Sequence, residues 1–422
     1  MYGLRRFGIK LGLSTINQIL SELGNPQNTY ACVHVAGTNG KGSVASTLAS
    51  ILNQAGYKTG LYTSPHLVNF NERIQINNRP ISNSNVVASY NTIKNTRTGD
   101  REPTFFEFAT VMAFFEFARQ KVDWAVIETG MGGRLDATNI IRPRVSIITN
   151  ISLEHRDYLG ETLKQISEEK AGIIKTRTPV ITGIRQKKAL AVIEKKAAEK
   201  SAPLYRLGKD FKVRRSASGT FSYHGVEANW QGLQTGLAGS HQVDNAALAL
   251  AACEILIRNG AKLSLDNIKA GLAKNRWPGR LEIVSTEPQI ILDGAHNFIA
   301  ARNLARFLST HFADRNLTMV IGILDDKPYN AMLKCLLPTA NRVILTRAKI
   351  NRALEPEKLE TLAKKIIPGV TIISDVRQAL KHAIKTASPE DVICVAGSLY
   401  VVGEAKEALK SGFSVQGSGF TG

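Results

Sequence analysis

The chain has 422 residues, more than one hydrophobic core usually organises, so two domains are expected. Its 43% hydrophobic and 21% charged residues are typical of globular proteins and exclude a disordered, collagen-like or coiled-coil chain. The net charge of +19 favours a surface that attracts anions, whether nucleotides, poly-acidic small molecules or nucleic acid.

Short β-branched segments alternate with helical segments along most of the chain, which predicts an α/β fold. The strands predicted in the first part are 31–36, 58–62, 124–128, 144–150 and 178–182, and the helices are 42–55, 84–95, 105–120, 162–172 and 187–200. Residues 205–234 change to short alternating pieces, which indicates antiparallel strands before a long helix at 242–259. We therefore expect an α/β domain over residues 1–279, which is of the P-loop ATPase type if the glycine-rich segment 37–43 binds phosphate.

The dipeptide Pro278-Gly279 interrupts the helical pattern and marks the predicted domain boundary. A second series of strands and helices follows, with strands at 289–292, 317–321, 342–345, 371–373 and 392–395. This series predicts a smaller, Rossmann-like C-terminal α/β domain over residues 280–422.

The sequence contains no feature that favours secretion or membrane insertion. The four cysteines are scattered without paired spacing, so neither a zinc site nor a disulfide framework is predicted. The most apolar window, residues 105–118, contains two glutamates and is too short to span a bilayer. The N-terminus lacks the apolar core of a signal peptide. We expect a cytoplasmic protein without membrane contact.

Residues 37–43, GTNGKGS, lie directly after a predicted buried strand and begin a helix. Glycines let backbone N–H groups turn toward phosphate oxygens, Lys41 supplies a positive charge, and the helix N-terminus adds its dipole. The spacing departs from GxxxxGK[ST], because Gly42 separates Lys41 from Ser43. The segment predicts a phosphate-binding loop, with an ordinary glycine-rich turn as the alternative.

Ser64, Glu128 and His155 each follow a predicted strand. Because carboxyl ends of parallel strands meet at one edge of a sheet, these side chains are expected to converge there. Serine and carboxylate oxygens suit Mg²⁺, whereas an imidazole ligand is less usual for it. Taken singly, each residue has a simpler explanation: a turn cap for Ser64, an ion pair for Glu128 and a loop position for His155.

Further charged residues are ambiguous from their positions alone. Lys170 follows two glutamates in a predicted helix, and this spacing indicates a surface lysine paired with acids. Arg280 lies at the domain boundary, and Asp293 ends the first strand of the second domain, shortly before His296. Such an aspartate can accept ribose hydroxyls and such an arginine can bind phosphate. A turn aspartate and a linker arginine fit equally well.

Nine segments occur in one order between residues 10 and 403 and together resemble a known family. They are HVAGTNGKGSV, YTSPHL, TFFEFAT, ETGMGGRLDATN, NISLEHRDYLG, EEKAGIIK, GSHQVDNA, WPGRLE and ILDGAHN. The set is similar to the bacterial bifunctional folylpolyglutamate synthase/dihydrofolate synthase family of the Mur ligase superfamily.

This resemblance implies an ATP-dependent ligase that joins L-glutamate to the carboxyl of tetrahydrofolate polyglutamates, and to dihydropteroate, through an acyl phosphate. ATP and Mg²⁺ are the implied cofactors, and monomer is the implied state. The residues matching ATP contacts are Asn39, Gly40, Lys41, Gly42, Ser43, Asn245, Arg280, Asp293 and His296. The magnesium ligands would be Ser64, Glu128 and His155, and the pterin contacts Leu11, Gly12, Leu13, Thr104, Phe105 and Leu135. Lys170 matches a carbamylated lysine and is implied to be catalytic with Lys41 and His155.

Two other readings are less favoured. Muramyl-precursor ligases share the ATP domain and the acyl-phosphate chemistry, but they generally place a UDP-sugar-binding domain ahead of the phosphate loop. Only 36 residues precede Gly37 in the sequence. A nucleic-acid-dependent NTPase would suit the basic charge. However, the eleven basic residues within 185–215 fit a solvated helix face and loop, and no helicase-like or RNA-binding motif occurs in the sequence, so no nucleic-acid partner is expected.

Overall fold

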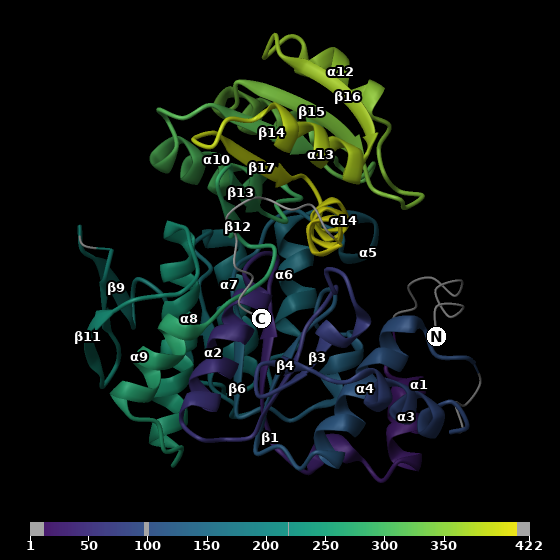
Figure 1. Ribbon diagram of the computed structural model, residues 1–422. Helices are drawn as coiled ribbons and strands as arrows, with labels where there is room; N and C mark the ends of the chain where they lie inside the picture. The colour runs from purple at the N-terminus through teal and green to yellow at the C-terminus, as the bar shows by residue number, and fades with distance from the viewer. Residues whose placement is uncertain (1–11, 97–100, 218, 412–422) are drawn as a thin grey trace. The chain divides into compact units, whose positions relative to one another are not determined.

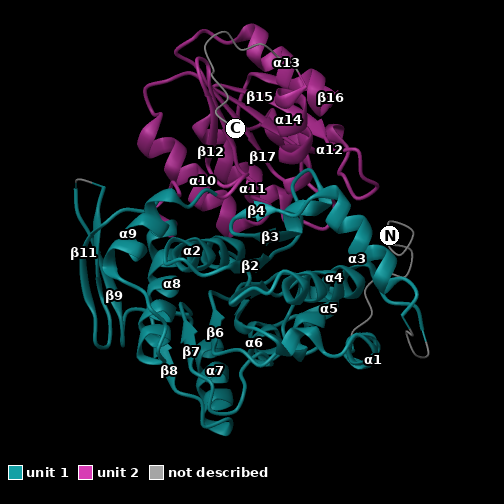
Figure 2. Cartoon of the chain, turned by 60° about the horizontal axis from the view of Figure 1, so that its bottom comes forward, with its two compact units in different colours: residues 1–236, 242–276 teal, residues 237–241, 277–422 magenta. Residues whose placement is uncertain are grey.

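The computed structural model describes residues 12–96, 101–217 and 219–411. They divide into two compact units, shown in teal and magenta in Figure 2. The first unit contains residues 1–236 and 242–276, and the second contains residues 237–241 and 277–422. The division falls after Arg276, whereas the sequence analysis placed the boundary after Gly279. Residues 237–241, in which the long helix begins, belong to the second unit.

The first unit is built on an eight-stranded sheet in the order β4-β3-β2-β5-β1-β6-β7-β8. Figure 1 labels β1, β3, β4 and β6 of this sheet. Strands β2, β5, β1, β6, β7 and β8 run parallel to one another. Strands β3 and β4 add an antiparallel edge beside β2. The bounds are β1 Ala31–Ala36, β2 Thr59–Tyr62, β3 Ile74–Ile76, β4 Arg79–Pro80, β5 Trp124–Glu128, β6 Val145–Ile148, β7 Val180–Thr182 and β8 Leu204–Arg206. The α/β class predicted from the sequence is confirmed.

The helices of this unit follow the predicted ones closely. They are α1 Ser14–Glu22, α2 Lys41–Gln54, α3 Asn83–Ile93, α4 Phe105–Arg119, α5 Arg156–Leu159, α6 Leu163–Ala171, α7 Lys187–Glu199, α8 Ser240–Arg258 and α9 Leu265–Lys274. Helices α1, α5 and α9, strand β8 and the β3–β4 edge were not predicted. Helix α9 packs closely on α2, where a Cβ at Gly271 would lie 2.5 Å from the Cα of Ile51.

Strand β1 lies at the centre of the sheet, between β5 and β6. Val35 pairs with Glu128 on one side, and Ala36 pairs with Ile148 on the other. Five of its six residues are buried, as expected for a parallel strand that is covered on both faces. The loops that follow β1, β5 and β6 therefore meet at one edge of the sheet, where ligands bind in open α/β folds.

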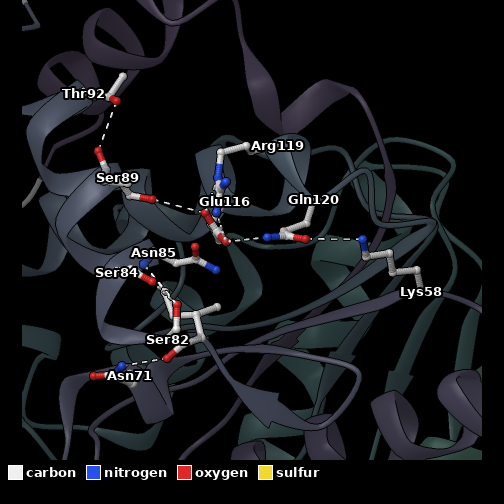
Figure 3. Close-up of polar contacts among 12 residues, drawn as sticks. Lys58, Asn71, Ser82, Ser84, Asn85, Ser89, Thr92, Glu116, Arg119 and Gln120 are labelled. Atoms are coloured by element: carbon white, nitrogen blue, oxygen red, sulfur yellow. Dashed lines mark hydrogen bonds and ion pairs between the residues drawn. The ribbon is translucent and has the colours of Figure 1, made fainter.

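A buried carboxylate joins α3 to α4 (Figure 3). The side chain of Glu116 is fully buried, and it accepts two hydrogen bonds of 2.8 Å from the guanidinium of Arg119. Ser89 of α3 donates to the same carboxylate at 3.2 Å, and Gln120 donates at 3.0 Å. A buried charge needs such partners, and here they fix the helix that begins at Thr104 and Phe105.

The predicted antiparallel segment forms a separate three-stranded sheet of β9 Lys212–Arg215, β10 Phe221–His224 and β11 Asn229–Leu233. Tyr223 donates to Glu254 of α8 at 2.7 Å, and its ring stacks on Trp230 with centroids 5.2 Å apart. The hydrogen bond to Glu254 holds the small sheet against α8, and the ring stack joins β10 to β11.

The second unit contains a six-stranded sheet in the order β12-β13-β17-β14-β15-β16. Its strands are β12 Glu282–Thr286, β13 Gln289–Leu292, β14 Leu317–Ile321, β15 Arg342–Arg347, β16 Val370–Asp375 and β17 Val392–Ala396. Its helices are α10 Phe298–His311, α11 Tyr329–Leu336, α12 Pro356–Ala363, α13 Val376–Thr386 and α14 Leu399–Lys410. All strands are parallel except the edge strand β12, which the sequence analysis missed. No helix in the described part of the chain is long and apolar enough to cross a bilayer.

Candidate functional site

The predicted phosphate loop connects β1 to α2 and is bound to the segment that follows β6. Thr38 donates its backbone N–H to the carbonyl of Asn150, and Asn39 donates to the Asn150 side chain, both at 2.9 Å. The carbonyl of Asn39 accepts from the Asn150 amide at 2.9 Å and from the Thr149 hydroxyl at 2.7 Å. These bonds fix the loop in place before any ligand binds.

Two glycines of this loop have no room for a side chain. Gly37 has φ +148°, and a Cβ there would lie 1.9 Å from the Thr149 hydroxyl oxygen. Gly40 has φ +80° and immediately precedes α2, and its Cβ would lie 2.5 Å from the side-chain oxygen of Asn245. Asn245 lies on α8, so the structure brings this predicted ATP contact to the loop. The first residue of α2 is Lys41, whose Nζ donates to the carbonyl of Thr38 at 3.3 Å.

Lys170 is buried against the phosphate loop. Its side chain is only 4% exposed, and Nζ donates to the carbonyl of Gly37 at 2.7 Å. Burial, reinforced by the charge of Lys41, lowers the pKa of Lys170 to about 7, against the opposing effect of Glu154 and Asp136. The prediction of a surface lysine, which rested on the helical spacing, is therefore wrong. A buried lysine of this kind is partly neutral near neutral pH and is then a nucleophile.

Ser64 and Glu128 lie together at the ends of adjacent strands β2 and β5. The backbone N–H of Ser64 donates to the Glu128 carboxylate at 3.1 Å, and the Glu128 side chain is 4% exposed. A buried carboxylate is a hard oxygen donor of the kind that suits Mg²⁺. Among the described residues, no group of three or more His, Cys, Asp and Glu side chains could hold a metal. The predicted magnesium ligands Ser64, Glu128 and His155 include only two residues of these four types, so this absence does not concern them.

His155 lies on the segment after β6, where Asn150 and Ser152 contact the phosphate loop. It immediately precedes α5 with φ 53°, a left-handed conformation that is uncommon for residues other than glycine. The side chain is exposed. Its ligation of a metal stays a prediction.

The residues predicted to contact pterin lie on three segments of the first unit, and Leu11 falls outside the described residues. Gly12 and Leu13 precede α1, and Leu135 is half-buried in the glycine-rich segment after β5. Thr104 caps α4, since its hydroxyl accepts the backbone N–H of Glu107 at 3.2 Å.

The ring of Phe105 is flanked by residues that the sequence analysis did not identify. It packs edge-on against Phe70, with centroids 6.0 Å apart, and the guanidinium carbon of Arg73 lies 5.2 Å from its centroid. Arg73 also donates to His66 at 2.7 Å. Phe70 and Arg73 are themselves buried, so they hold the Phe105 ring in place.

Three predicted nucleotide contacts lie together in the second unit, at the end of β13. The carboxylate of Asp293 accepts backbone N–H groups of Leu281 and Ala295, both at 2.9 Å. Burial raises the pKa of Asp293, and the charge of Arg280 opposes this shift. A Cβ at Gly294 would lie 2.4 Å from the Arg280 guanidinium, and the same residue's carbonyl lies 2.8 Å from Nδ1 of His296.

The sequence analysis also missed a line of hydrogen bonds between buried polar side chains. His34 of β1 is bonded to Thr138, and Thr138 is bonded to Asp136 of the glycine-rich segment. Nothing in the apolar pattern of β1 indicates a partner 104 residues away.

The chain matches known proteins over both units. Residues 35–253 match the Mur ligase middle domain, and residues 279–399 match the Mur ligase, glutamate ligase domain. Dihydrofolate synthase/folylpolyglutamate synthase of Bacillus subtilis is 36% identical over 97% of each chain.

Two solved structures are similar across nearly the whole length. Escherichia coli FolC in complex with DHPP and ADP has a TM-score of 0.90 and 32% identity, over 97% of this chain and 96% of that one. The bifunctional folylpolyglutamate synthase/dihydrofolate synthase of Yersinia pestis, complexed with AMPPNP and Mn ion, has a TM-score of 0.85 and 33% identity, over 96% and 94%. The chain therefore belongs to the Mur ligase family, within its dihydrofolate synthase/folylpolyglutamate synthase group.

Proposed function

We propose that this protein is an ATP-dependent ligase that joins L-glutamate to the carboxyl of tetrahydrofolate polyglutamates and of dihydropteroate. The proposal rests on one observation: side chains from three separate helices lie at the phosphate loop. Lys41 begins the helix after the loop, Lys170 binds the carbonyl of Gly37, and Asn245 contacts Gly40. The Ser64–Glu128 pair lies at the same edge of the sheet.

These parts suit phosphoryl transfer to a carboxylate. A carboxylate is a poor electrophile, so the γ-phosphoryl of ATP first passes to the folate carboxyl oxygen, which releases ADP. The amine of glutamate then attacks the acyl carbon, an amide bond forms, and phosphate leaves with the carboxyl oxygen. Lys41 and the N-terminus of α2 offset negative charge on the transferring group.

We propose Ser64, Glu128 and His155 as the ligands of a magnesium ion. The carboxylate oxygens of Glu128 and the Ser64 hydroxyl are hard donors of the kind that Mg²⁺ takes. Bound Mg²⁺ supplies charge stabilisation to phosphate oxygens. Removing Glu128 would also leave the Ser64 N–H without this acceptor, so the residue orders the loop after β2 as well.

We propose that Lys170 is carbamylated in the active protein. The neutral amine nitrogen attacks CO₂, a C–N bond forms, and a proton leaves to solvent, which gives a carbamate anion. The depressed pKa of Lys170, about 7, supports this reaction because only the neutral amine can attack. The product would place negative charge beside Lys41, whose positive charge now disfavours the ammonium form.

On the substrate side, the ring of Phe105 with Thr104 and Leu135 is proposed to hold the pterin, together with residues 11–13. Arg73 adds a cation beside that ring. In the second unit, Arg280, Asp293 and His296 are proposed to contact nucleotide.

We further propose a cytoplasmic monomer that needs no nucleic acid. All four cysteines are unpaired, which suits a reducing compartment, and light scattering would test the monomer.

The direct test measures phosphate release with ATP, Mg²⁺ and glutamate. Dihydropteroate, tetrahydrofolate and its diglutamate are offered in turn, with a muramyl-peptide precursor as a fourth acceptor. Release that depends on a folate acceptor is expected. Release only with the muramyl precursor, or none with any acceptor, would contradict the folate assignment.

A pair of variants connects that activity to the site. Lys41→Ala is expected to abolish turnover while the protein stays folded, because the charge beside the phosphates is lost. Lys164→Ala removes an exposed lysine of α6 and should leave turnover unchanged. Full activity of Lys41→Ala would mean that the loop does not bind ATP.

A further inference from the structure

A histidine with an unusual environment lies in the central strand. His34 is fully buried in β1 with valines on either side, and its Nε2 lies 2.8 Å from the hydroxyl oxygen of Thr138. The Thr138 hydroxyl donates in turn to Oδ1 of Asp136 at 2.5 Å. An apolar side chain would fill this strand position at lower desolvation cost, so the polar group needs an explanation.

The direction of the protons in this line follows from the donor inventory. A hydroxyl has one proton, and Thr138 gives it to the Asp136 carboxylate. The Thr138 oxygen can then only accept from His34, so Nε2 carries the ring proton. Nδ1 of His34 has no hydrogen-bond partner among the described residues. Burial lowers the pKa of His34 to about 3, so the ring is neutral and keeps this single donor.

The carboxylate of Asp136 holds the glycine-rich segment 131–136 through hydrogen bonds to its backbone. Its Oδ2 accepts the backbone N–H of Met131 at 2.8 Å, and Oδ1 also accepts that of Thr138 at 3.0 Å. The carboxylate thus joins the two ends of the segment. Its orientation depends on the Thr138 hydroxyl, which His34 holds from behind.

The same segment packs on the end of α6 that carries Lys170. Arg134 donates its backbone N–H to the carbonyl of Glu169 at 2.7 Å. A Cβ at Gly133 would lie 2.9 Å from the carbonyl oxygens of both Glu169 and Lys170. The approach is therefore close enough that a shift of the segment must move the helix end.

Lys170 closes a ring of contacts back to β1. Its Nζ binds the carbonyl of Gly37, which follows β1 three positions after His34. We propose that His34 is a positioning residue: through Thr138 and Asp136 it fixes the glycine-rich segment and with it the placement of Lys170 on the phosphate loop. His34 contacts no reacting atom in this account, which rests on the proposed ligase function.

The first test compares His34→Leu with Cys32→Ala in the full chain. Cys32 is a buried residue two positions earlier on the same strand, outside the ring of contacts. His34→Leu is expected to lower kcat about tenfold while the KM for ATP stays within about twofold, as for loss of one buried hydrogen bond that acts on the chemical step. Cys32→Ala should lower the melting temperature without changing kcat.

Rescue and coupling separate positioning from simple packing. His34→Gln places an amide donor near the position of Nε2 and is expected to restore kcat to within about threefold of the unmodified protein. Thr138→Val should lower kcat about tenfold alone but only about twofold in the His34→Leu background, because both act through one line. If His34→Leu does not fold, Thr138→Ser and Thr138→Val replace it, and only the serine variant should keep activity.

Three outcomes would overturn the proposal: an unchanged kcat in His34→Leu, no rescue by His34→Gln, or equal effects of Thr138→Val in both backgrounds. Folate-dependent phosphate release by the unmodified protein is measured first. Its absence would refute the ligase function, whereas its presence with one of these outcomes would refute only the role of His34.

Discussion

Replacing Lys170 with methionine tests whether this lysine is held in its neutral form beside the phosphate loop. Methionine fills a similar volume without a charge and without a titrating group. In CO₂-free buffer, where no carbamate forms, the stability difference between the two proteins reports the protonation of Lys170 alone. The unmodified protein is therefore expected to gain stability relative to Lys170→Met as the pH rises.

The magnitude follows from the pKa, which falls from 10.5 to about 7 in the folded protein. Between these values the unfolded chain binds the proton and the folded chain does not, so raising the pH favours folding. Each pH unit in this window is worth about 1.4 kcal/mol. From about pH 7, where Lys170 is half protonated in the folded protein, to about pH 9 the free energy of unfolding should therefore rise by about 2 kcal/mol relative to Lys170→Met.

Urea denaturation at several pH values, followed by fluorescence, measures this difference. Lys164→Met, which removes an exposed lysine of the same helix, serves as the control and should follow the unmodified protein. Parallel stability profiles of the unmodified protein and Lys170→Met across this window would refute the reasoning, because they would mean that Lys170 stays protonated when folded.

Three further predictions concern the same edge of the sheet. Bicarbonate added to CO₂-stripped protein should raise kcat, more at pH 8 than at pH 6, because neutral Lys170 forms the carbamate; no response would exclude a carbamate requirement. Gly37→Ala should cost about 2–4 kcal/mol in urea denaturation and weaken ATP binding, since its Cβ meets Thr149, whereas Gly56→Ala, at φ +88° in open space, should cost about 1 kcal/mol. Glu128→Gln should weaken Mn²⁺ binding in calorimetry at least about tenfold, and unchanged affinity would exclude this ligand.

Much of the fold was predictable because periodicity reports burial. The buried strand at 31–36 and the strand at 124–128 have the predicted bounds, since parallel strands covered on both faces are nearly continuous in apolar residues. The strand Glu282–Thr286 was missed because half-exposed edge strands have mixed composition. Helix Leu265–Lys274 was missed although Ser264 caps it, because it follows α8 after a short turn.

The site was predictable only where a motif carries its own chemistry. The phosphate loop is recognisable in the sequence because its glycines and lysine lie between a predicted strand and a predicted helix. Lys170 has ordinary helical spacing, and its burial arises from tertiary packing that brings Gly37 to it from 133 positions away. The line from His34 to Asp136 is invisible for the same reason, since its bonds join strands and loops distant in the chain.

The most direct test of the account follows oxygen-18 in the folate carboxylate during a single turnover with ATP and glutamate. Transfer of the γ-phosphoryl to the carboxylate predicts amide product together with phosphate that carries one labelled oxygen. Amide product with unlabelled phosphate would contradict the acyl-phosphate route, and labelled folate recovered without amide would contradict the ligase itself.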